Sequence, residues 1–265
     1  MREDSPSRSA SKQSPRMNIL GVGVSALTME SALQQSVALL QRGDRGYVCV
    51  TGVHGIIEAQ KDEAFRRLLN KSFMTTPDGM PTVWLGRLRG FQVSRVYGPE
   101  YMLAVCEMSA NTGYRHFLYG GRPNVAEELR TELVRRFPGI IIAGIYTPPF
   151  RPLDEKEEAE LRAHVEAASV DIFWCGLSTP KQEKFIAAHY ETLPVKLMVG
   201  VGAAFDLLSG NLRDAPKWMK VSGLQWFYRL IQEPRRLWRR YMVNNPVFVW
   251  LTMLQLLRLR RYRLE

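Results

Sequence analysis

The sequence predicts an α/β protein built on a mostly parallel, Rossmann-like sheet that is covered by helices. From residue 46 onward, short β-rich runs alternate with helical stretches of about 10–15 residues, which is the pattern of βαβ units. Hydrophobic residues make up 46% of the 265 residues, enough to fill a sizeable core. We therefore expect a single α/β domain over residues 17–211, flanked by two segments of different composition.

Six runs have the composition of buried strands. They are residues 46–51, 73–75, 116–119, 140–146, 170–176 and 195–201. The stretches between several of them have helical patterns, and we expect helices through residues 56–59 and over 124–137, 153–167 and 181–190. In the helix at 124–137, acidic residues near the start and arginines near the end suit the helix dipole.

The two ends of the chain differ from this core. Residues 1–16 are polar and Ser-rich, which predicts a flexible leader and not a secretion signal. Residues 213–265 contain 12 of the 36 Lys and Arg residues but only three acids, so they carry +9 of the formal net charge of +10. They also contain four of the six tryptophans. We expect residues 212–265 to form a basic, helical C-terminal appendage.

Arginine interleaved with tryptophan suits a water–lipid boundary, although a nucleic-acid binder can have the same composition. The longest apolar run, residues 246–257, is broken by Thr252 and Gln255. It is shorter than the ~20 residues that a helix needs to span a bilayer. The appendage is therefore expected to lie on a membrane and not to cross it.

Metal, disulfide and dinucleotide sites are not expected. Cys49, Cys106 and Cys175 lie in apolar runs with neither metal-binding spacing nor a disulfide framework, which indicates buried, reduced thiols of a cytosolic protein. The histidines form no ligand cluster, and no Asp-x-Asp pair is present to hold a divalent ion. Gly21 and Gly23 lack the third glycine and the following helix of a dinucleotide-binding fingerprint.

The carboxyl ends of parallel strands meet at one edge of a sheet, where ligands bind. This places the loops beginning at residues 51, 78, 120, 147, 178 and 203 along one rim. Asp78 lies in a Thr-Pro-Asp-Gly turn, either as an ordinary turn residue or as a general base. Lys181 and Gln182 occupy the first turn of a helix, where either plain capping or a phosphate or sugar ligand would explain the sequence.

Small residues over 200–206, ending at Asp206, permit either a close ligand or close helix–sheet packing. In the appendage, a helix that begins near Pro234 would place Arg236, Arg239 and Arg240 on one side. Arg229, on the preceding element, could join them across the turn. The alternative is a solvated basic face.

Taken together, these stretches resemble the TagA/WecG/CpsF glycosyltransferases (glycosyltransferase family 26), which act on polyprenyl-linked intermediates of bacterial cell-surface polymers. The resemblance covers residues 18–263. It is carried by Val50-Thr51 with Glu58-Ala59, by Thr76-Pro-Asp-Gly79, Arg95-Val-Tyr-Gly98, Phe117-Leu-Tyr-Gly-Gly121, Pro180-Lys-Gln-Glu183 and residues 200–206, and by residues 223–236 (GLQWFYRLIQEPRR).

The resemblance implies inverting transfer of a hexosyl unit from a UDP-sugar to a polyprenyl-diphosphate-linked saccharide, without a cofactor. The sugar would be of the N-acetylmannosamine, N-acetylmannosaminuronate or glucose type. It also implies a peripheral protein on the cytoplasmic face of the bacterial inner membrane, bound to an anionic membrane surface and not to nucleic acid. The sequence does not decide whether the protein forms a homo-oligomer.

The resemblance also implies roles for individual residues. Asp78 would be the base that accepts the proton of the acceptor hydroxyl. The appendage arginines Arg229, Arg236 and Arg239 would close over the site and neutralise diphosphate charge in place of a metal. The substrate-binding set is Thr51, Arg95, Gln182, Asp206, Arg229, Arg236 and Arg239.

Two positions depart from the family pattern. Val53 stands where the family commonly has Asn, and Glu100 stands where Asp is usual. Both positions are expected near the pocket, so the donor need not be of the N-acetylmannosamine type, and a glucosyl donor stays open. Two other functions also stay open: a non-catalytic UDP-sugar-binding partner of a polysaccharide synthase, and a nucleic-acid-binding protein.

Overall fold

The computed structural model describes residues 14–264 and contains a six-stranded sheet whose strands all run parallel. The strand order is β4-β3-β8-β7-β5-β6. The bounds are β3 (Gly46–Thr51), β4 (Met74–Pro77), β5 (Arg115–Gly120), β6 (Ile141–Tyr146), β7 (Ile172–Gly176) and β8 (Leu197–Gly200). The predicted α/β class is confirmed, and all six strands lie within two residues of the predicted bounds.

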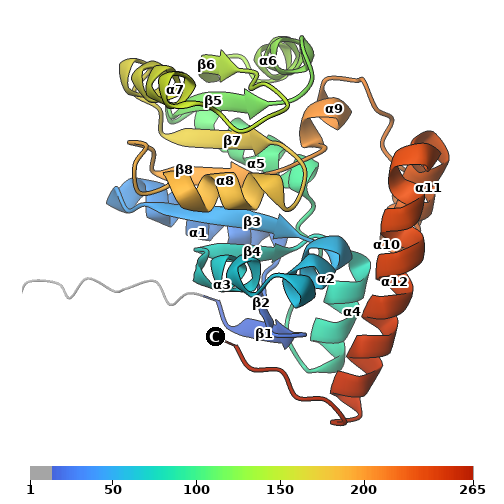
Figure 1. Cartoon of the computed structure of the whole chain (residues 1–265). Coiled ribbons are helices and arrows are strands. Elements are labelled where there is room, and N and C mark those ends of the chain that lie inside the picture. The colour runs from blue at the N-terminus through green and yellow to red at the C-terminus, as the bar shows by residue number, and fades with distance from the viewer. Residues whose placement is uncertain (1–13, 265) are drawn as a thin grey trace, which may run out of the picture.

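Helices cover both faces of the sheet (Figure 1). Successive strand residues point to opposite faces, so Tyr47 and Cys49 lie in one core while Val48 and Val50 lie in the other. The first core is closed by α2 (Val53–Lys61), α3 (Glu63–Lys71), α7 (Glu155–Ala167) and α8 (Lys181–His189), and the second by α1 (Met29–Arg42), α5 (Gly98–Ala110) and α6 (Val125–Arg136).

The N-terminal part contains a hairpin that the sequence pattern did not predict. β1 (Arg16–Ile19) pairs antiparallel with β2 (Val22–Ser25). Leu20 and Gly21 form the turn with φ of 53° and 82°. Glycine adopts a positive φ without steric cost, which explains Gly21 at this turn. Arg16 already belongs to β1, whereas the predicted leader extends to residue 16. Residues 1–13 of that leader lie outside the described part of the chain.

The C-terminal segment forms a column of helices that stands across the carboxyl ends of the strands (Figure 1). After α9 (Ala204–Leu208), it consists of α10 (Lys217–Val221), α11 (Gln225–Gln232) and the 23-residue α12 (Pro234–Leu256). The remaining chain returns beneath β1, where Asn18 Nδ2 donates to the carbonyl oxygen of Tyr262 at 2.7 Å. No helix in residues 14–264 combines the length and apolar character needed to cross a membrane.

One side of α12 is buried against the domain. Leu237, Asn244, Phe248 and Thr252 are each 5% exposed or less, and they follow the spacing of a single helix face. Phe248 belongs to the same core as α2, and α12 packs along α2. This contact fixes the column of helices over the rim of the sheet.

Candidate active site

Asp78 lies directly after β4, at the rim that the column of helices covers. Its backbone N–H donates to the carbonyl oxygen of Thr51 at the end of β3, at 3.3 Å. The N–H of Gly98 donates to its carboxylate, yet Oδ1 is shielded from solvent and has no hydrogen-bond partner among the described residues. The turn therefore holds Asp78 firmly while leaving one carboxylate oxygen free for a ligand.

Burial raises the pKa of Asp78 to about 6. The charges of Arg95, Arg229 and Arg240, together with the Gly98 hydrogen bond, act in the opposite direction. A carboxylate with a pKa near neutrality is ionised at pH 7 and still accepts a proton more readily than an ordinary aspartate. These properties suit a general base.

Arg95 links Asp78 to the appendage. Its Nη2 lies 4.0 Å from Asp78 Oδ1 and donates a hydrogen bond to the side-chain oxygen of Gln225, the first residue of α11. The guanidinium also lies 4.1 Å from the centre of the Tyr97 ring. Tyr97 in turn donates to Asp214 at 3.1 Å, so two side chains of the rim are bonded to the appendage.

Arg229 and Arg240 bring two further guanidiniums from the appendage. Arg229, on α11, pairs with Glu233 at 3.2 Å, but its Nε is buried without a hydrogen-bond partner among the described residues. Arg240 lies on the buried side of α12, and its Nε is likewise buried and unpartnered there. No carboxylate in residues 14–264 forms an ion pair with Arg240.

Burial lowers the pKa of Arg240, and the charges of Arg229 and Arg236 lower it further. A shielded guanidinium next to like charges is costly unless an anion accompanies it. The charges of Arg95, Arg229 and Arg240 all act on the carboxylate of Asp78, while Glu233 pairs with Arg229 and the charge of Glu183 acts on Arg240. A diphosphate has the charge and the oxygen acceptors to complete such a site.

Gln182 and Glu183 form the opposite wall at the start of α8. Gln182 Nε2 donates to Glu183 Oε1 at 2.9 Å, and Thr179 Oγ1 donates to the same oxygen at 2.8 Å. Gln182 Oε1 and Glu183 Oε2 are both buried without hydrogen-bond partners in the described chain. Burial also raises the pKa of Glu183. The wall thus presents two polar oxygens that are unsatisfied without a ligand.

His54 connects this wall to the appendage. Its Nδ1 accepts from Asn244 Nδ2 at 2.8 Å, and its ring has a backbone hydrogen bond with Thr179. Burial and the charge of Arg240 lower the pKa of His54 to about 4. The ring is therefore neutral at pH 7, and it ties α12 to the loop that precedes Gln182.

The other predicted residues are distributed along the rim. Thr51 is 2% exposed at the end of β3. Asp206, on α9 after β8, pairs at 3.0 Å with Arg122, which follows β5 on the side of the sheet away from β4 and Asp78. Arg236 is exposed and pairs with Glu233. Arg239 points outward and stacks on Trp238, 5.2 Å from the ring centre, so the structure does not bring it to Asp78.

Residues 17–262 match the Glycosyl transferase WecG/TagA/CpsF family. Two similar proteins are both named N-acetylglucosaminyldiphosphoundecaprenol N-acetyl-beta-D-mannosaminyltransferase. One, from Bacillus spizizenii strain W23, is 32% identical over 193 residues, and the other, from Bacillus subtilis strain 168, is 32% identical over 191 residues. Each match covers 72% of this chain and 72% of the relative.

The chain belongs to the WecG/TagA/CpsF glycosyltransferase family. The resemblance inferred from the motifs is thus confirmed, and the protein is a glycosyltransferase. The match extends through α12, so the appendage belongs to the family region and is not an added tail.

The two departures from the family pattern have different surroundings. Val53 is the first residue of α2 and packs against the first core. Glu100, in the first turn of α5, pairs with Lys220 of α10 at 3.0 Å. Lys220 also pairs with Asp214 at 3.0 Å. Glu100 is therefore one more link between the domain and the appendage.

Arg240, His54 and Glu183 are site residues that the sequence reasoning did not select. For Arg240 a signal existed, because it lies on the same helical stripe as Leu237, Asn244 and Phe248, whereas Arg239 does not. His54 carries no such signal, since its bond to Asn244 joins segments that are distant in sequence. Glu183 belongs to the Pro180-Lys-Gln-Glu183 motif, but the motif alone does not show that its carboxylate is buried.

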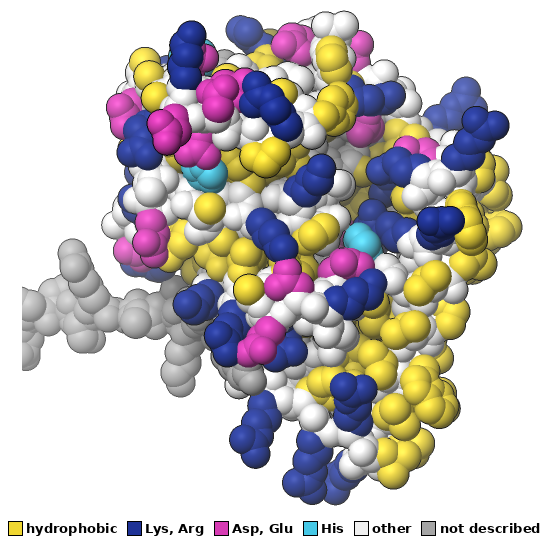
Figure 2. All heavy atoms as spheres, in the orientation of Figure 1, with side chains coloured by type: hydrophobic (Ala, Val, Ile, Leu, Met, Phe, Trp, Pro, Cys, Tyr) yellow, Lys and Arg dark blue, Asp and Glu magenta, His cyan; other side chains and the backbone are white. Residues whose placement is uncertain are grey.

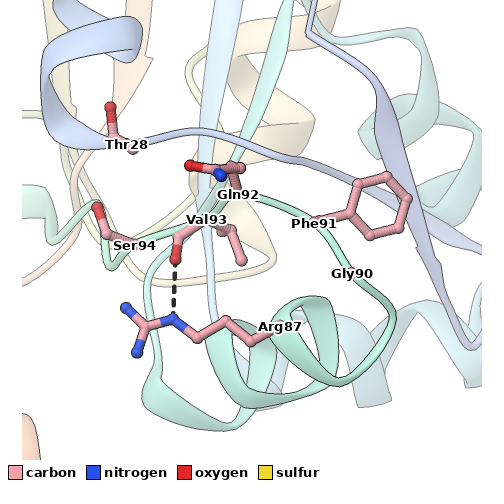
Figure 3. Close-up of a pocket in the computed structure, with 7 residues that line it drawn as sticks. All are labelled: Thr28, Arg87, Gly90, Phe91, Gln92, Val93 and Ser94. Carbon is pink, nitrogen blue, oxygen red and sulfur yellow. Dashed lines mark hydrogen bonds between the residues drawn. The ribbon is translucent and has the colours of Figure 1, made fainter.

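Within residues 14–264, no group of three or more His, Cys, Asp or Glu side chains is placed to hold a metal ion. A separate hollow of about 480 Å³ lies beside the segment that follows α4 (Met80–Leu88), lined by residues 90–94 (Figure 3). Its single charged side chain, Arg87, donates to the carbonyl oxygen of Val93 at 3.1 Å. The charged side chain of this hollow therefore stabilises the segment that follows α4.

Proposed function

We propose that this glycosyltransferase transfers a hexosyl unit from a UDP-sugar to a saccharide carried on a polyprenyl diphosphate, with inversion at the anomeric carbon. The observation that carries the proposal is the group of three guanidiniums, those of Arg95, Arg229 and Arg240, whose charges act on the buried carboxylate of Asp78. The relatives' names supply the acceptor class, because both specify an N-acetylglucosaminyl-diphosphoundecaprenol.

In the proposed reaction, the acceptor hydroxyl oxygen attacks C1 of the donor sugar while Asp78 accepts the hydroxyl proton. The bond from C1 to the phosphate oxygen breaks, and its electron pair leaves with UDP. The guanidiniums of Arg229 and Arg240 neutralise charge on a diphosphate in a partly desolvated site, where such an interaction is strong. Gln182 and Asp206 would bind sugar or nucleotide groups along the rim.

The same proposal gives the appendage a membrane-facing role. Hydrophobic side chains gather along α11 and α12, and Lys and Arg side chains lie at both ends of this band (Figure 2). Trp218, Ile231, Trp238 and Leu257 are all exposed there. An apolar band flanked by cations suits peripheral binding to an anionic membrane. The cytoplasmic face of the inner membrane, where UDP-sugars are available, is the proposed location.

The test is transfer by the purified protein with N-acetylglucosaminyl-diphosphoundecaprenol and a panel of UDP-sugars. The panel contains UDP-N-acetylmannosamine, UDP-N-acetylmannosaminuronate and UDP-glucose, because Val53 and Glu100 leave the donor open. NMR of the product would give the anomeric configuration, and an inverted linkage is expected. A retained linkage, or UDP binding without transfer to any lipid-linked acceptor, would contradict the proposal.

A further inference from the structure

The outer side of the appendage has an apolar groove next to the arginines. It lies between α11 and α12, has a volume of about 490 Å³, and is lined by Trp226, Tyr241, Pro246, Val249, Trp250 and Met253 among others. The volume falls within the range of about 300–1,000 Å³ that is typical of ligand pockets. Trp226 and Tyr241 meet edge to face with ring centres 5.8 Å apart, so the two helices build the groove together.

At two places, consecutive residues of one helix lie at the polar site and at the groove. Gln225 bonds Arg95 beside Asp78, while the next residue, Trp226, lines the groove. Arg240 faces the site, while Tyr241 lines the groove. Consecutive residues of an α-helix point about 100° apart, so each helix presents a polar side to the site and an apolar flank to the groove.

We propose that this groove binds the isoprenoid chain of the lipid-linked acceptor, with the diphosphate held by Arg229 and Arg240. The proposal rests on the function proposed above, which requires a substrate with a diphosphate joined to a single apolar chain. The matching features are adjacent in the chain: Arg240 forms no ion pair with a carboxylate of residues 14–264, and the next residue, Tyr241, lines the apolar groove.

Other exposed apolar residues of the appendage lie outside the groove. Trp238, Val243 and Leu257 are 49%, 53% and 64% exposed and do not line the groove. They offer a surface for the two-chain lipids of a bilayer. The groove residues Val249, Trp250 and Met253 are exposed to a similar extent, 55%, 60% and 48%, but they line a hollow between two helices, which suits a single chain whose diphosphate is bound beside it.

A photoreactive farnesyl diphosphate that carries a benzophenone group tests the groove without requiring turnover. Trypsin cleaves after Arg240 and Arg258, with no Lys or Arg between them, so most of the groove wall is released as one peptide, residues 241–258. We expect the label on this peptide and on Trp226. Val249→Trp fills the groove and should reduce labelling by about tenfold, and Met253→Lys should act similarly.

The matched control is Val243→Trp, which adds the same side chain to an exposed position of α12 outside the groove and should leave labelling unchanged. Equal losses in Val249→Trp and Val243→Trp, or displacement of the label by phosphatidylcholine vesicles, would identify the groove as a bilayer contact and overturn the proposal. Labelling in the groove without sugar transfer would refute only the proposed function. Transfer with the label elsewhere would refute only the groove.

Discussion

The two sides of α12 differ in what they contact. The inner side carries Leu237, Arg240, Asn244 and Phe248, which face the α/β domain and the rim of the sheet. The outer side carries Trp238, Arg239 and the apolar residues of the band in Figure 2. A single helix can therefore complete an active site and face a lipid surface, because its two sides meet different environments.

We expect the largest loss of activity at Asp78, the carboxylate on which the charge of Arg240 on the inner side of α12 acts. Asp78→Asn keeps the shape of the side chain but removes the base, and we expect kcat to fall by about 10²–10⁴-fold. UDP binding should persist, since the guanidiniums are unchanged. Steady-state kinetics and calorimetric titration with UDP would measure the two effects separately.

The pH dependence of the same residue provides a second readout. Because burial raises the pKa of Asp78 to about 6, the base loses activity as pH falls through 6, and kcat/KM should then decrease by about tenfold per pH unit. The residual activity of Asp78→Asn should lack this acid limb. An unchanged limb in the variant would assign the titration to another group.

Adjacent arginines give the sharpest comparison between the two sides. Arg240→Ala removes a shielded guanidinium that faces the site, and we expect a loss of about 10²–10³-fold in kcat/KM. Arg239→Ala removes the same charge from the outer side, where its guanidinium stacks on Trp238, and should leave soluble-acceptor kinetics nearly unchanged. Equal losses in the two variants would show that net charge, and not position, is what matters.

These two arginines also show how far the sequence could lead. The alternation of strands and helices predicted the sheet because strands such as β3, β5 and β7 consist of short apolar runs, which the structure buries. The rim followed from parallel topology, which places Thr51, Asp78 and Gln182 at the same edge. The family pattern selected Arg239, whereas the buried stripe of α12 brings Arg240 to the site.

Other features depend on contacts between distant segments and leave no local pattern. The bond from Asn244 to His54 joins residues 190 positions apart, and Tyr262 reaches back to Asn18 over 244 positions. The β1–β2 hairpin was missed because its strands have only four residues each and its glycine was weighed as part of a nucleotide fingerprint. Such features are set by packing geometry, which composition and spacing do not encode.

Docking of the inner side should depend on Phe248. This residue is 4% exposed in the core shared with α2, and Phe248→Ala should reduce the stability of the docked helix by about 3 kcal/mol. Limited proteolysis should then cut the appendage faster, with a parallel loss of activity. Val247→Ala, at a 39% exposed neighbouring position, is the control and should change neither. Fast cleavage with full activity would show that catalysis does not require the docked appendage.

The smallest expected effect concerns the basic residues that follow α12. Arg258 and Arg261 are exposed, and each basic side chain near an anionic surface contributes about 1 kcal/mol of binding. The double substitution Arg258→Ala and Arg261→Ala should therefore weaken binding to phosphatidylglycerol vesicles by about thirtyfold at low salt. Because salt screens such attractions, the difference should shrink toward zero at high ionic strength.

Removing the same charge from the far side of the domain, with Arg130→Ala and Arg162→Ala, is the control. If both pairs weaken vesicle binding equally, the membrane responds to overall charge and the outer side of the appendage is not the docking face. A loss specific to Arg258 and Arg261, with transfer to a soluble acceptor unchanged, would separate membrane attachment from the chemistry that the inner side of α12 serves.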